Sequence, residues 1–282
     1  MPTIAQLVTW GTHYLERRQV PQARQNCEVL LARALERDRT WLWAHPEDQL
    51  AAGQEALARA WLARRGRREP LWYILGEEEF YGLRFAVDRR VLIPRPETEM
   101  LVDAGLAYLR RHPGARVVDL CTGSGCVAIA LAVNAPPGAV LAVDKEPGAL
   151  AVARENAGRH GVGERVTFLP GDLWGPVPGP VDLVLANPPY VRCCDFAELM
   201  PEVRDHEPTE ALEAGEDGLD VIRPLLAQAP EYLRPGGALY VEIGEEQGQA
   251  VLELARTAFP QARVAIHQDL AGLDRMLSVE TG

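Results

Sequence analysis

The sequence predicts an α/β protein in which a small all-helical N-terminal domain precedes a mostly parallel, doubly wound sheet. Three observations lead to this prediction. The length of 282 residues corresponds to about two domains. The first 70 residues carry only helical apolar spacing. From Arg116 onward, β-type apolar runs alternate with helical patterns, and such alternation is typical of βαβ units.

The N-terminal segment has the pattern of a series of helices. Thr3 and Gln6 form a capping-box pattern just ahead of an apolar helical stripe. The expected elements are, in order, a helix that begins after Thr3, a helix over residues 21–37, a turn over residues 40–44 and a helix over residues 47–64. Residues 1–70 are therefore predicted to form a separate helical domain.

An aromatic-rich segment follows this domain. Residues 71–94 contain many β-prone side chains and are broken by Gly76 and Gly82, which predicts a β-hairpin that links two domains. The proline and acidic residues just after it favour the first turn of a helix that begins near Glu99. Residues 95–282 are then expected to form the second domain.

Seven strands are predicted in the second domain. Each is a short apolar run bounded by turn-forming residues. The runs are residues 116–120, 139–143, 165–169, 181–186, 238–243, 262–266 and 276–279. Because helical patterns separate the earlier runs, we expect these strands to lie mostly parallel in one sheet.

A glycine-rich turn ends the first of these strands. The strand runs into Cys121-Thr122-Gly123-Ser124-Gly125, and a helical pattern follows. Glycines let the backbone approach a ligand closely, and the start of the helix offers free N–H groups. Asp144 closes the next strand, where a carboxylate can accept hydrogen bonds from both hydroxyls of a ribose. Taken alone, this pattern also fits the dinucleotide fingerprint G-x-G-x-x-A.

The tetrapeptide Asn187-Pro188-Pro189-Tyr190 follows the fourth strand, at the carboxyl edge of the sheet and beside the glycine turn. An amide or aromatic amine nitrogen is a poor nucleophile because its lone pair is delocalised. The Asn187 side-chain oxygen and the Pro188 carbonyl can accept both of its hydrogens and aim the nitrogen at an electrophile. The prolines restrict the backbone in advance, and Tyr190 offers a face for stacking and for attracting a sulfonium methyl. The alternative is a rigid structural loop.

Composition argues against several functional classes. The net charge of −11 argues against a protein whose main function is to bind the phosphate backbone of nucleic acids. No apolar run reaches the roughly 18 residues of a membrane-spanning helix, and no leader pattern is present, so we expect a cytoplasmic protein without membrane contact. The five cysteines form no CxxC pair and the six histidines no HExxH array, so neither disulfides nor a metal are expected.

With these motifs, the sequence resembles class I S-adenosylmethionine-dependent methyltransferases, and above all the HemK-type release factor glutamine methyltransferases. The resemblance covers most of the chain. Its sharpest element is Ile93-Pro94-Arg95-Pro96-Glu97-Thr98-Glu99. The other matches are the glycine turn, the tetrapeptide and residues 70–76, 80–82, 207–208, 211–212 and 218–219. The implied fold is Rossmann-like with a seven-stranded sheet.

The activity implied by the resemblance is methyl transfer from S-adenosylmethionine to the side-chain amide nitrogen, N5, of a glutamine. That glutamine belongs to the Gly-Gly-Gln motif of peptide chain release factors one and two. The helical domain is expected to recognise this substrate, because residues 1–70 hold 11 basic and 8 acidic residues and residues 71–282 hold 18 and 32. No direct contact with nucleic acid is expected.

The resemblance also implies roles for single residues. The glycine turn lines the methionine part of the cofactor, Asp144 holds its ribose, and Asp172 and Leu173 flank its adenine. The tetrapeptide binds the glutamine side chain, with Asn187, Pro188 and Tyr190 expected to act in the reaction. The full cofactor set is Cys121, Thr122, Gly123, Ser124, Gly125, Asp144, Asp172, Leu173 and Asn187, and Pro189 joins the substrate set.

The sequence departs from the family pattern at two positions. Cys121 stands where the family more often has glycine, which is expected to tighten the turn. Leu173 stands where an aromatic side chain can flank adenine, and the neighbouring Trp174 is the candidate to replace it. Arg95, Glu97 and Glu99 fit either a site or ion pairs of an interdomain linker, and we leave them outside the catalytic set.

Three alternative functions remain open on the sequence. An adenine amino methyltransferase acting on DNA or RNA shares the tetrapeptide for the same geometry, but the acidic second half and the lack of a basic, aromatic-rich insert count against it. A second alternative is a glutamine methyltransferase acting on a ribosomal protein. The third is a catalytically silent, cofactor-sensing scaffold, which the intact tetrapeptide disfavours.

Overall fold

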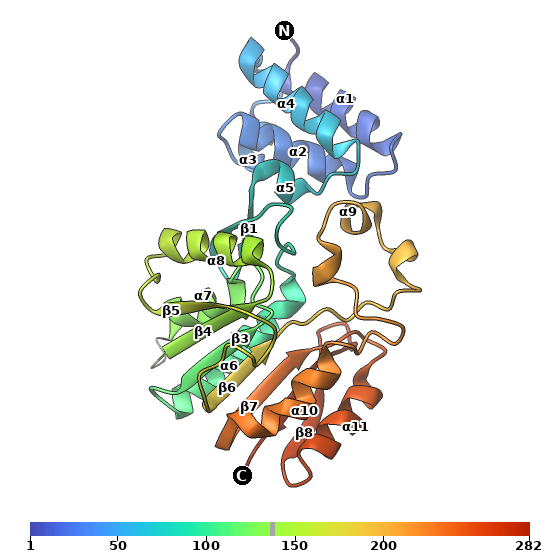
Figure 1. Cartoon of the computed structure of the whole chain (residues 1–282). Coiled ribbons are helices and arrows are strands. Elements are labelled where there is room, and N and C mark those ends of the chain that lie inside the picture. Colours follow the sequence, from blue (N-terminus) through green and yellow to red (C-terminus); the bar gives the residue numbers. More distant parts are fainter. Residues whose placement is uncertain (136–138) are drawn as a thin grey trace. The chain divides into compact units, whose positions relative to one another are not determined.

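The computed structural model describes residues 1–135 and 139–282 (Figure 1). The chain divides into two compact units. The first contains Met1–Glu77 together with Met200–His206, and the second contains Glu78–Leu199 and Glu207–Gly282. A short segment from late in the chain therefore belongs to the N-terminal unit, which the sequence did not indicate. Within the described residues, no helix has both the length and the apolar character needed to cross a membrane.

The first unit is all-helical, as predicted. Its helices are α1 (Ile4–Glu16), α2 (Ala23–Ala34), α3 (Arg39–Ala44), α4 (Ala52–Arg65), α5 (Leu71–Leu75) and α9 (Pro201–Arg204). The capping box is confirmed, because the Thr3 hydroxyl accepts from the Gln6 amide and the Gln6 side chain accepts from the Thr3 amide. The turn expected over residues 40–44 is instead helix α3, capped by the Asp38 carboxylate, which accepts from the Trp41 amide at 2.7 Å.

Helix α9 is attached to this unit by a buried ion-pair cluster. The Glu202 carboxylate is 6% exposed and accepts hydrogen bonds from Arg65 at 2.7 Å and from Arg68 at 2.5 Å and 2.8 Å. Arg65 also donates to the Asn26 side chain at 2.7 Å. Burial by itself raises the pKa of Glu202, but the hydrogen bonds from Arg68 and Arg65 outweigh it and lower that pKa. The segment after the tetrapeptide is thus bonded to the helical unit.

The second unit contains the predicted seven-stranded sheet. Its strands are β3 (Arg116–Leu120), β4 (Ala139–Asp144), β5 (Val166–Pro170), β6 (Val181–Ala186), β7 (Leu233–Glu242), β8 (Arg263–Gln268) and β9 (Asp274–Glu280). They lie in the order β5-β4-β3-β6-β7-β9-β8, and the pairs from β5 through β7 are parallel while β9 runs antiparallel to both neighbours. The prediction of a mostly parallel, doubly wound sheet is confirmed.

Helices cover both faces of this sheet. Helices α6 (Glu99–Arg111) and α7 (Cys126–Asn134) supply buried side chains to one apolar core, to which α8 (Pro147–Arg159) adds Ala157, and α10 (Ile222–Tyr232) and α11 (Gly248–Ala258) supply the other. Neighbouring residues of β3 point to opposite cores, since Val117 packs in the first and Val118 in the second, and both are 0% exposed. Strands buried on both faces need continuous apolar runs, which explains why their positions were readable from sequence.

The predicted hairpin is present but shorter than expected. Strands β1 (Glu77–Phe80) and β2 (Leu83–Ala86) form a two-stranded sheet. They are joined by Tyr81 and Gly82, whose φ angles of +53° and +72° match the two positive values that a type I′ turn requires. The Tyr81 amide donates to Glu99 and its hydroxyl to Asp103, which ties the hairpin to α6. Residues expected to start the hairpin form helix α5 instead.

Candidate active site

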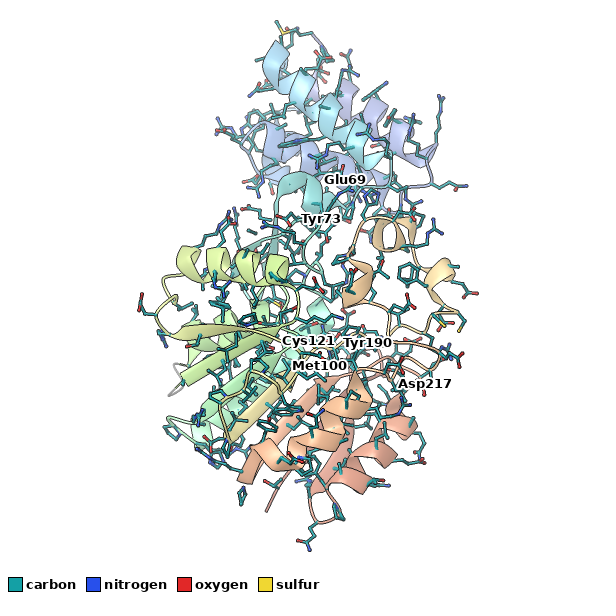
Figure 2. All side chains as sticks on the ribbon, viewed as in Figure 1. Glu69, Tyr73, Met100, Cys121, Tyr190 and Asp217 are labelled. Atoms are coloured by element: carbon teal, nitrogen blue, oxygen red, sulfur yellow. The ribbon has the colours of Figure 1, made fainter. Side chains whose placement is uncertain are left out.

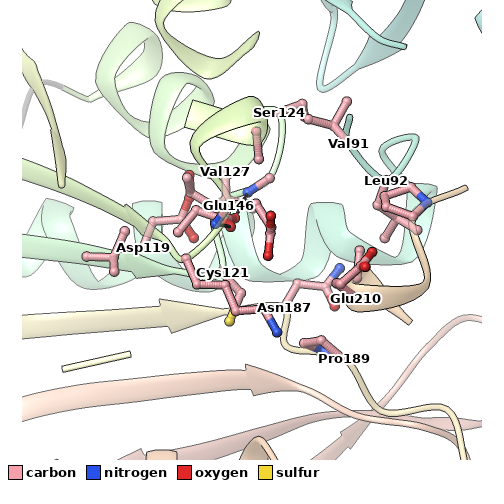
Figure 3. Close-up of a pocket in the computed structure, with 18 of the residues that line it drawn as sticks. Val91, Leu92, Asp119, Cys121, Ser124, Val127, Glu146, Asn187, Pro189 and Glu210 are labelled. Carbon is pink, nitrogen blue, oxygen red and sulfur yellow. Dashed lines mark hydrogen bonds between the residues drawn. The ribbon is translucent and has the colours of Figure 1, made fainter. Parts of the chain in front are cut away.

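The sheet order determines where the site lies. Strand β3 is central, with β4 on one side and β6 on the other, so the chain reverses its winding direction there and leaves a crevice at the carboxyl ends of the strands. A pocket occupies this position (Figure 3). Its wall is formed by residues at the ends of β3, β4, β5 and β6 and by residues from segments 90–98 and 208–211.

The glycine turn forms one wall of the pocket. Cys121, Gly123 and Gly125 all have positive φ angles, of +59°, +55° and +81°. A Cβ atom at Gly125 would lie 2.9 Å from Ile129 and 3.1 Å from Ala153, so only glycine fits there. The left-handed conformation of Cys121 explains why glycine suits that position. Cys121, Thr122, Gly123 and Ser124 line the pocket, whereas Gly125 caps α7 just behind them.

The buried carboxylate of Asp119 supports the glycine turn. The Thr122 hydroxyl donates to Asp119 at 2.5 Å, and the Ala128 amide donates to the same oxygen at 3.2 Å. Asp119 is 1% exposed, and burial raises its pKa to about 7. The turn and the first residues of α7 are therefore held by one side chain that ends β3.

Asp144 faces the pocket and also holds the turn. Its Oδ2 atom accepts from the Gly123 amide at 2.9 Å, and its Oδ1 atom accepts from the Glu146 amide at 2.9 Å. Burial raises the pKa of this carboxyl, and the two backbone amides oppose that shift. Each oxygen keeps a further lone pair, so the carboxylate can still accept two hydroxyl hydrogens.

Asp172 and Leu173 lie in the pocket wall, where an adenine is expected. Leu173 is 7% exposed and has a φ angle of +43°. Trp174 does not replace an aromatic at this position, which corrects the expectation from sequence. Its ring is fully buried, stacks on Tyr232 at a centroid distance of 4.7 Å and donates to the Leu225 carbonyl at 2.9 Å. It belongs to the core under α10 because its large apolar ring and its N–H group are both satisfied there.

The structure brings Asn187 and Pro189 to the same pocket as the glycine turn. The Asn187 side-chain nitrogen donates to the Thr98 hydroxyl at 3.1 Å. Pro188 and Tyr190 are not in the lining of this pocket. Tyr190, labelled in Figure 2 with Cys121, is half-buried, and its hydroxyl lies 3.5 Å from Glu242. Burial raises the pKa of the Tyr190 hydroxyl, so it is neutral and acts as a donor.

Two buried residues, Thr98 next to Asn187 and Glu242 next to Thr98, could not be identified as site residues from the sequence. The Thr98 hydroxyl donates to Glu242 at 2.6 Å, and the two side chains are 2% and 3% exposed. Burial raises the pKa of Glu242 to about 7. In the sequence, Thr98 belongs to the motif of residues 93–99 and Glu242 to the predicted strand 238–243, so neither carries a local signal of this contact.

Two further buried side chains hold the pocket walls. Asn156 is 0% exposed, and it exchanges hydrogen bonds with the backbone of Ala86 and donates to the Ser124 carbonyl. Glu207 accepts from the Ile93 amide at 3.1 Å and from Arg95 at 2.6 Å. Arg95 lines the pocket, so the motif that contains it is part of the site wall as well as a connection between elements.

The pocket fits S-adenosylmethionine on its chemistry. It offers a carboxylate for a ribose, an apolar residue beside Asp172 for an adenine, and a turn in which Gly123 has no side chain to keep a ligand from the backbone. Among residues 1–135 and 139–282, no group of three or more His, Cys, Asp or Glu side chains is arranged to hold a metal ion. The described cysteines are free thiols.

Both parts of the chain match known protein families. Residues 6–76 match the family model of the PrmC N-terminal domain, and residues 98–199 match the methyltransferase small domain. The chain is 44% identical over 283 aligned residues to a release factor glutamine methyltransferase of Geobacter sulfurreducens, covering 99% of this chain and 97% of that protein. It is 42% identical over 273 residues to the protein of that name from Deinococcus radiodurans, covering 96% of each.

A solved structure supports the fold independently. A methyltransferase from Pyrococcus furiosus matches with a TM-score of 0.54 and 17% identity over 78% of this chain and 98% of that one. This likeness concerns the fold alone, whereas the sequence matches extend over both units. On those full-length matches, the chain belongs to the release factor glutamine methyltransferase family.

Proposed function

We propose that this protein methylates the side-chain amide nitrogen of the glutamine in the Gly-Gly-Gln motif of release factors one and two, with S-adenosylmethionine as methyl donor. The observation that carries the proposal is the position of Asn187. Its carboxamide shares one pocket with the glycine turn and Asp144. The names of full-length relatives support the substrate class.

The cofactor subsite is assigned from the pocket wall. Asp144 accepts hydrogen bonds from the ribose hydroxyls, residues 121–124 surround the methionine part with Gly125 just behind them, and Asp172 and Leu173 flank the adenine. When bound, S-adenosylmethionine supplies an electrophilic methyl on a sulfonium and is left as S-adenosylhomocysteine. The chain's own contribution is to hold this group rigidly, because Asp144 is already bonded to the turn that it shares with the ligand.

The substrate subsite is assigned to the tetrapeptide, of which Asn187 and Pro189 line the pocket and Pro188 and Tyr190 are their neighbours in the chain. The Asn187 oxygen and the Pro188 carbonyl accept the two hydrogens of the glutamine amide, and Pro189 and Tyr190 flank its plane. The nitrogen lone pair then forms the new bond to carbon, the carbon–sulfur bond breaks with its electrons left on sulfur, and the nitrogen loses one proton to solvent. Orientation lowers the barrier because the nucleophile is weak and must be aligned.

The helical unit is proposed to orient the release factor, with the shorter hairpin of β1 and β2 as the link and the unit that contains the seven-stranded sheet as the catalytic domain. Its support is the excess of basic over acidic residues in residues 1–70 and a partly exposed cluster of aromatic and arginine side chains. In that cluster, Arg59 lies 4.3 Å over the Trp10 ring and Arg18 lies 3.7 Å over the Tyr14 ring. Reversing both charges, Arg18→Glu with Arg59→Glu, should raise KM for the release factor and leave cofactor affinity unchanged. An unchanged KM would remove this assignment.

Mass spectrometry tests the proposal directly. A release factor incubated with the protein and methyl-labelled cofactor should gain one methyl on the glutamine of its Gly-Gly-Gln motif. A release factor whose motif glutamine is replaced by glutamate is the matched control and should gain none. Label on duplex DNA, on RNA or on a ribosomal protein, with none on release factor, would favour the alternative activities instead.

A further inference from the structure

A row of three side chains leads from the core of the sheet to the pocket. Glu242, at the end of β7, accepts from the Thr98 hydroxyl at 2.6 Å. The Thr98 oxygen in turn accepts from the Asn187 side-chain nitrogen at 3.1 Å. Thr98 and Asn187 line the pocket, whereas Glu242 lies behind them.

The direction of these hydrogen bonds has a chemical cause. An ionised carboxylate only accepts, so the single hydroxyl hydrogen of Thr98 must go to Glu242. The remaining lone pairs of Thr98 then accept a hydrogen, and the only part of the Asn187 side chain that can supply one is its NH2 group. The carboxamide oxygen is consequently directed away from Thr98.

We propose that Thr98 and Glu242 are positioning residues that orient the Asn187 carboxamide, so that its oxygen and not its nitrogen faces the hydrogens of the substrate amide. This inference rests on the proposed function of Asn187. A rotated Asn187 would present two donors to a substrate group that also donates, which would repel it rather than orient it. In this role both residues act through Asn187, although Thr98 also lines the pocket.

The environment of Glu242 makes the orientation of the Asn187 carboxamide depend on pH. The charged or titratable groups around it are Glu97 before α6, Cys126 of α7, Tyr190 after β6 and Arg275 of β9, and the neutral Thr98 is its hydrogen-bond donor. Burial raises the pKa of Glu242 to about 7, ahead of the opposing hydrogen bond from Thr98. A protonated Glu242 can donate to Thr98, which frees the Thr98 hydrogen for the Asn187 oxygen and removes the constraint. The methyl-transfer rate is therefore expected to rise as the pH rises through about 7.

Single-turnover rates at saturating cofactor test the role of Thr98. Thr98→Val keeps the shape and removes the hydroxyl, and we expect a loss of about 10- to 100-fold, as for other residues that orient a first-contact group. Thr98→Ser should restore most of the rate. In an Asn187→Ala background, Thr98→Val should cause no further loss, because the group it orients is gone. Ser278→Ala, which removes a buried hydroxyl from β9 without touching the pocket, is the matched control and should keep the wild-type rate.

Two more readouts separate positioning from folding and from the proposed function. Glu242→Gln keeps an acceptor for Thr98 but cannot ionise, so its rate should lose the rise near neutral pH that the wild type shows. In full-length protein labelled at asparagine nitrogen, one of the two Asn187 side-chain hydrogens should be protected from exchange by its bond to Thr98. Thr98→Val should abolish that protection, and this readout does not depend on methyl transfer.

Different failures have different meanings. A wild-type protein that leaves the release factor unmethylated would overturn the proposed function, while the exchange measurement would still decide the orientation of Asn187. Full activity in Thr98→Val, or an equal further loss in the Asn187→Ala background, would overturn the positioning role even if methylation is confirmed.

Discussion

Asp144 offers a quantitative test of the cofactor site. Its two oxygens are used by two different backbone donors, the amides of Gly123 and Glu146, each at 2.9 Å. The ribose is expected to add two more hydrogen bonds to the same carboxylate. A hydrogen bond to a charged group contributes about 1.5 to 3 kcal/mol, so losing two ribose bonds in Asp144→Ala should weaken binding at least about a hundredfold.

The structure also predicts the result for Asp144→Asn. An asparagine presents one oxygen and one NH2 group, so one of the two backbone amides must face a donor instead of an acceptor. We therefore expect Asp144→Asn to bind cofactor little better than Asp144→Ala, although it is nearly isosteric.

Isothermal titration calorimetry measures the affinity of each Asp144 variant for S-adenosylmethionine, and Asp182→Ala is the matched control. Asp182 also accepts from a backbone amide, that of Arg116 at 2.7 Å, but at the opposite edge of the sheet. Its loss should lower stability and leave cofactor affinity intact. An Asp144→Ala affinity within about twofold of wild type, a difference of less than about 0.5 kcal/mol, would refute the assignment.

Three other predictions follow from the same pocket. Cys121→Gly should be more stable than Cys121→Ala by about 1 kcal/mol in urea unfolding, because the φ angle of +59° strains any residue with a Cβ atom. For Asp119, burial raises the pKa to about 7, above its unfolded value, so the stability that its neutral form provides is lost as the pH rises toward 7. Asp119→Asn keeps the accepting oxygen and should lose less stability between pH 5 and pH 8, and parallel losses would contradict this. Asn187→Ala should slow single-turnover methyl transfer by about 10² to 10³ with little change in cofactor affinity, and Asn187→Asp, which keeps an acceptor, should retain more activity. Equal single-turnover rates for wild type and Asn187→Ala would make the tetrapeptide a structural turn.

Much of the fold was predictable because the strands of a sheet covered on both faces must be apolar at every position. The predicted run 116–120 is identical with β3, and 181–186 is identical with β6. The prediction of a strand was wrong where helix-bounding residues flank a segment of β-prone composition. Residues Trp72 to Ile74 are β-prone, yet Pro70 and the left-handed Gly76 bracket a single helical turn there.

The segment 200–206 shows a second kind of limit. Nothing near Glu202 in the sequence predicts that it joins the helical unit, because its partners Arg65 and Arg68 are more than 130 residues away in the chain. Ion pairs of this kind depend on the folded path. The same holds for Thr98 and Glu242, which are 144 residues apart.

The same contrast between local and long-range signals applies to the candidate site. The residues expected to touch the ligands lie in contiguous motifs, because a turn or a rigid loop needs consecutive residues of defined type. The residues that hold those motifs do so largely through backbone atoms, as Asn156 does at Ala86 and Ser124 and Glu207 does at Ile93. A backbone amide or carbonyl is the same in every residue, so the partner of such a side chain leaves no mark on the sequence. The motifs expected to contact the ligands were therefore recognisable in the sequence, whereas the side chains that support those motifs required the structure.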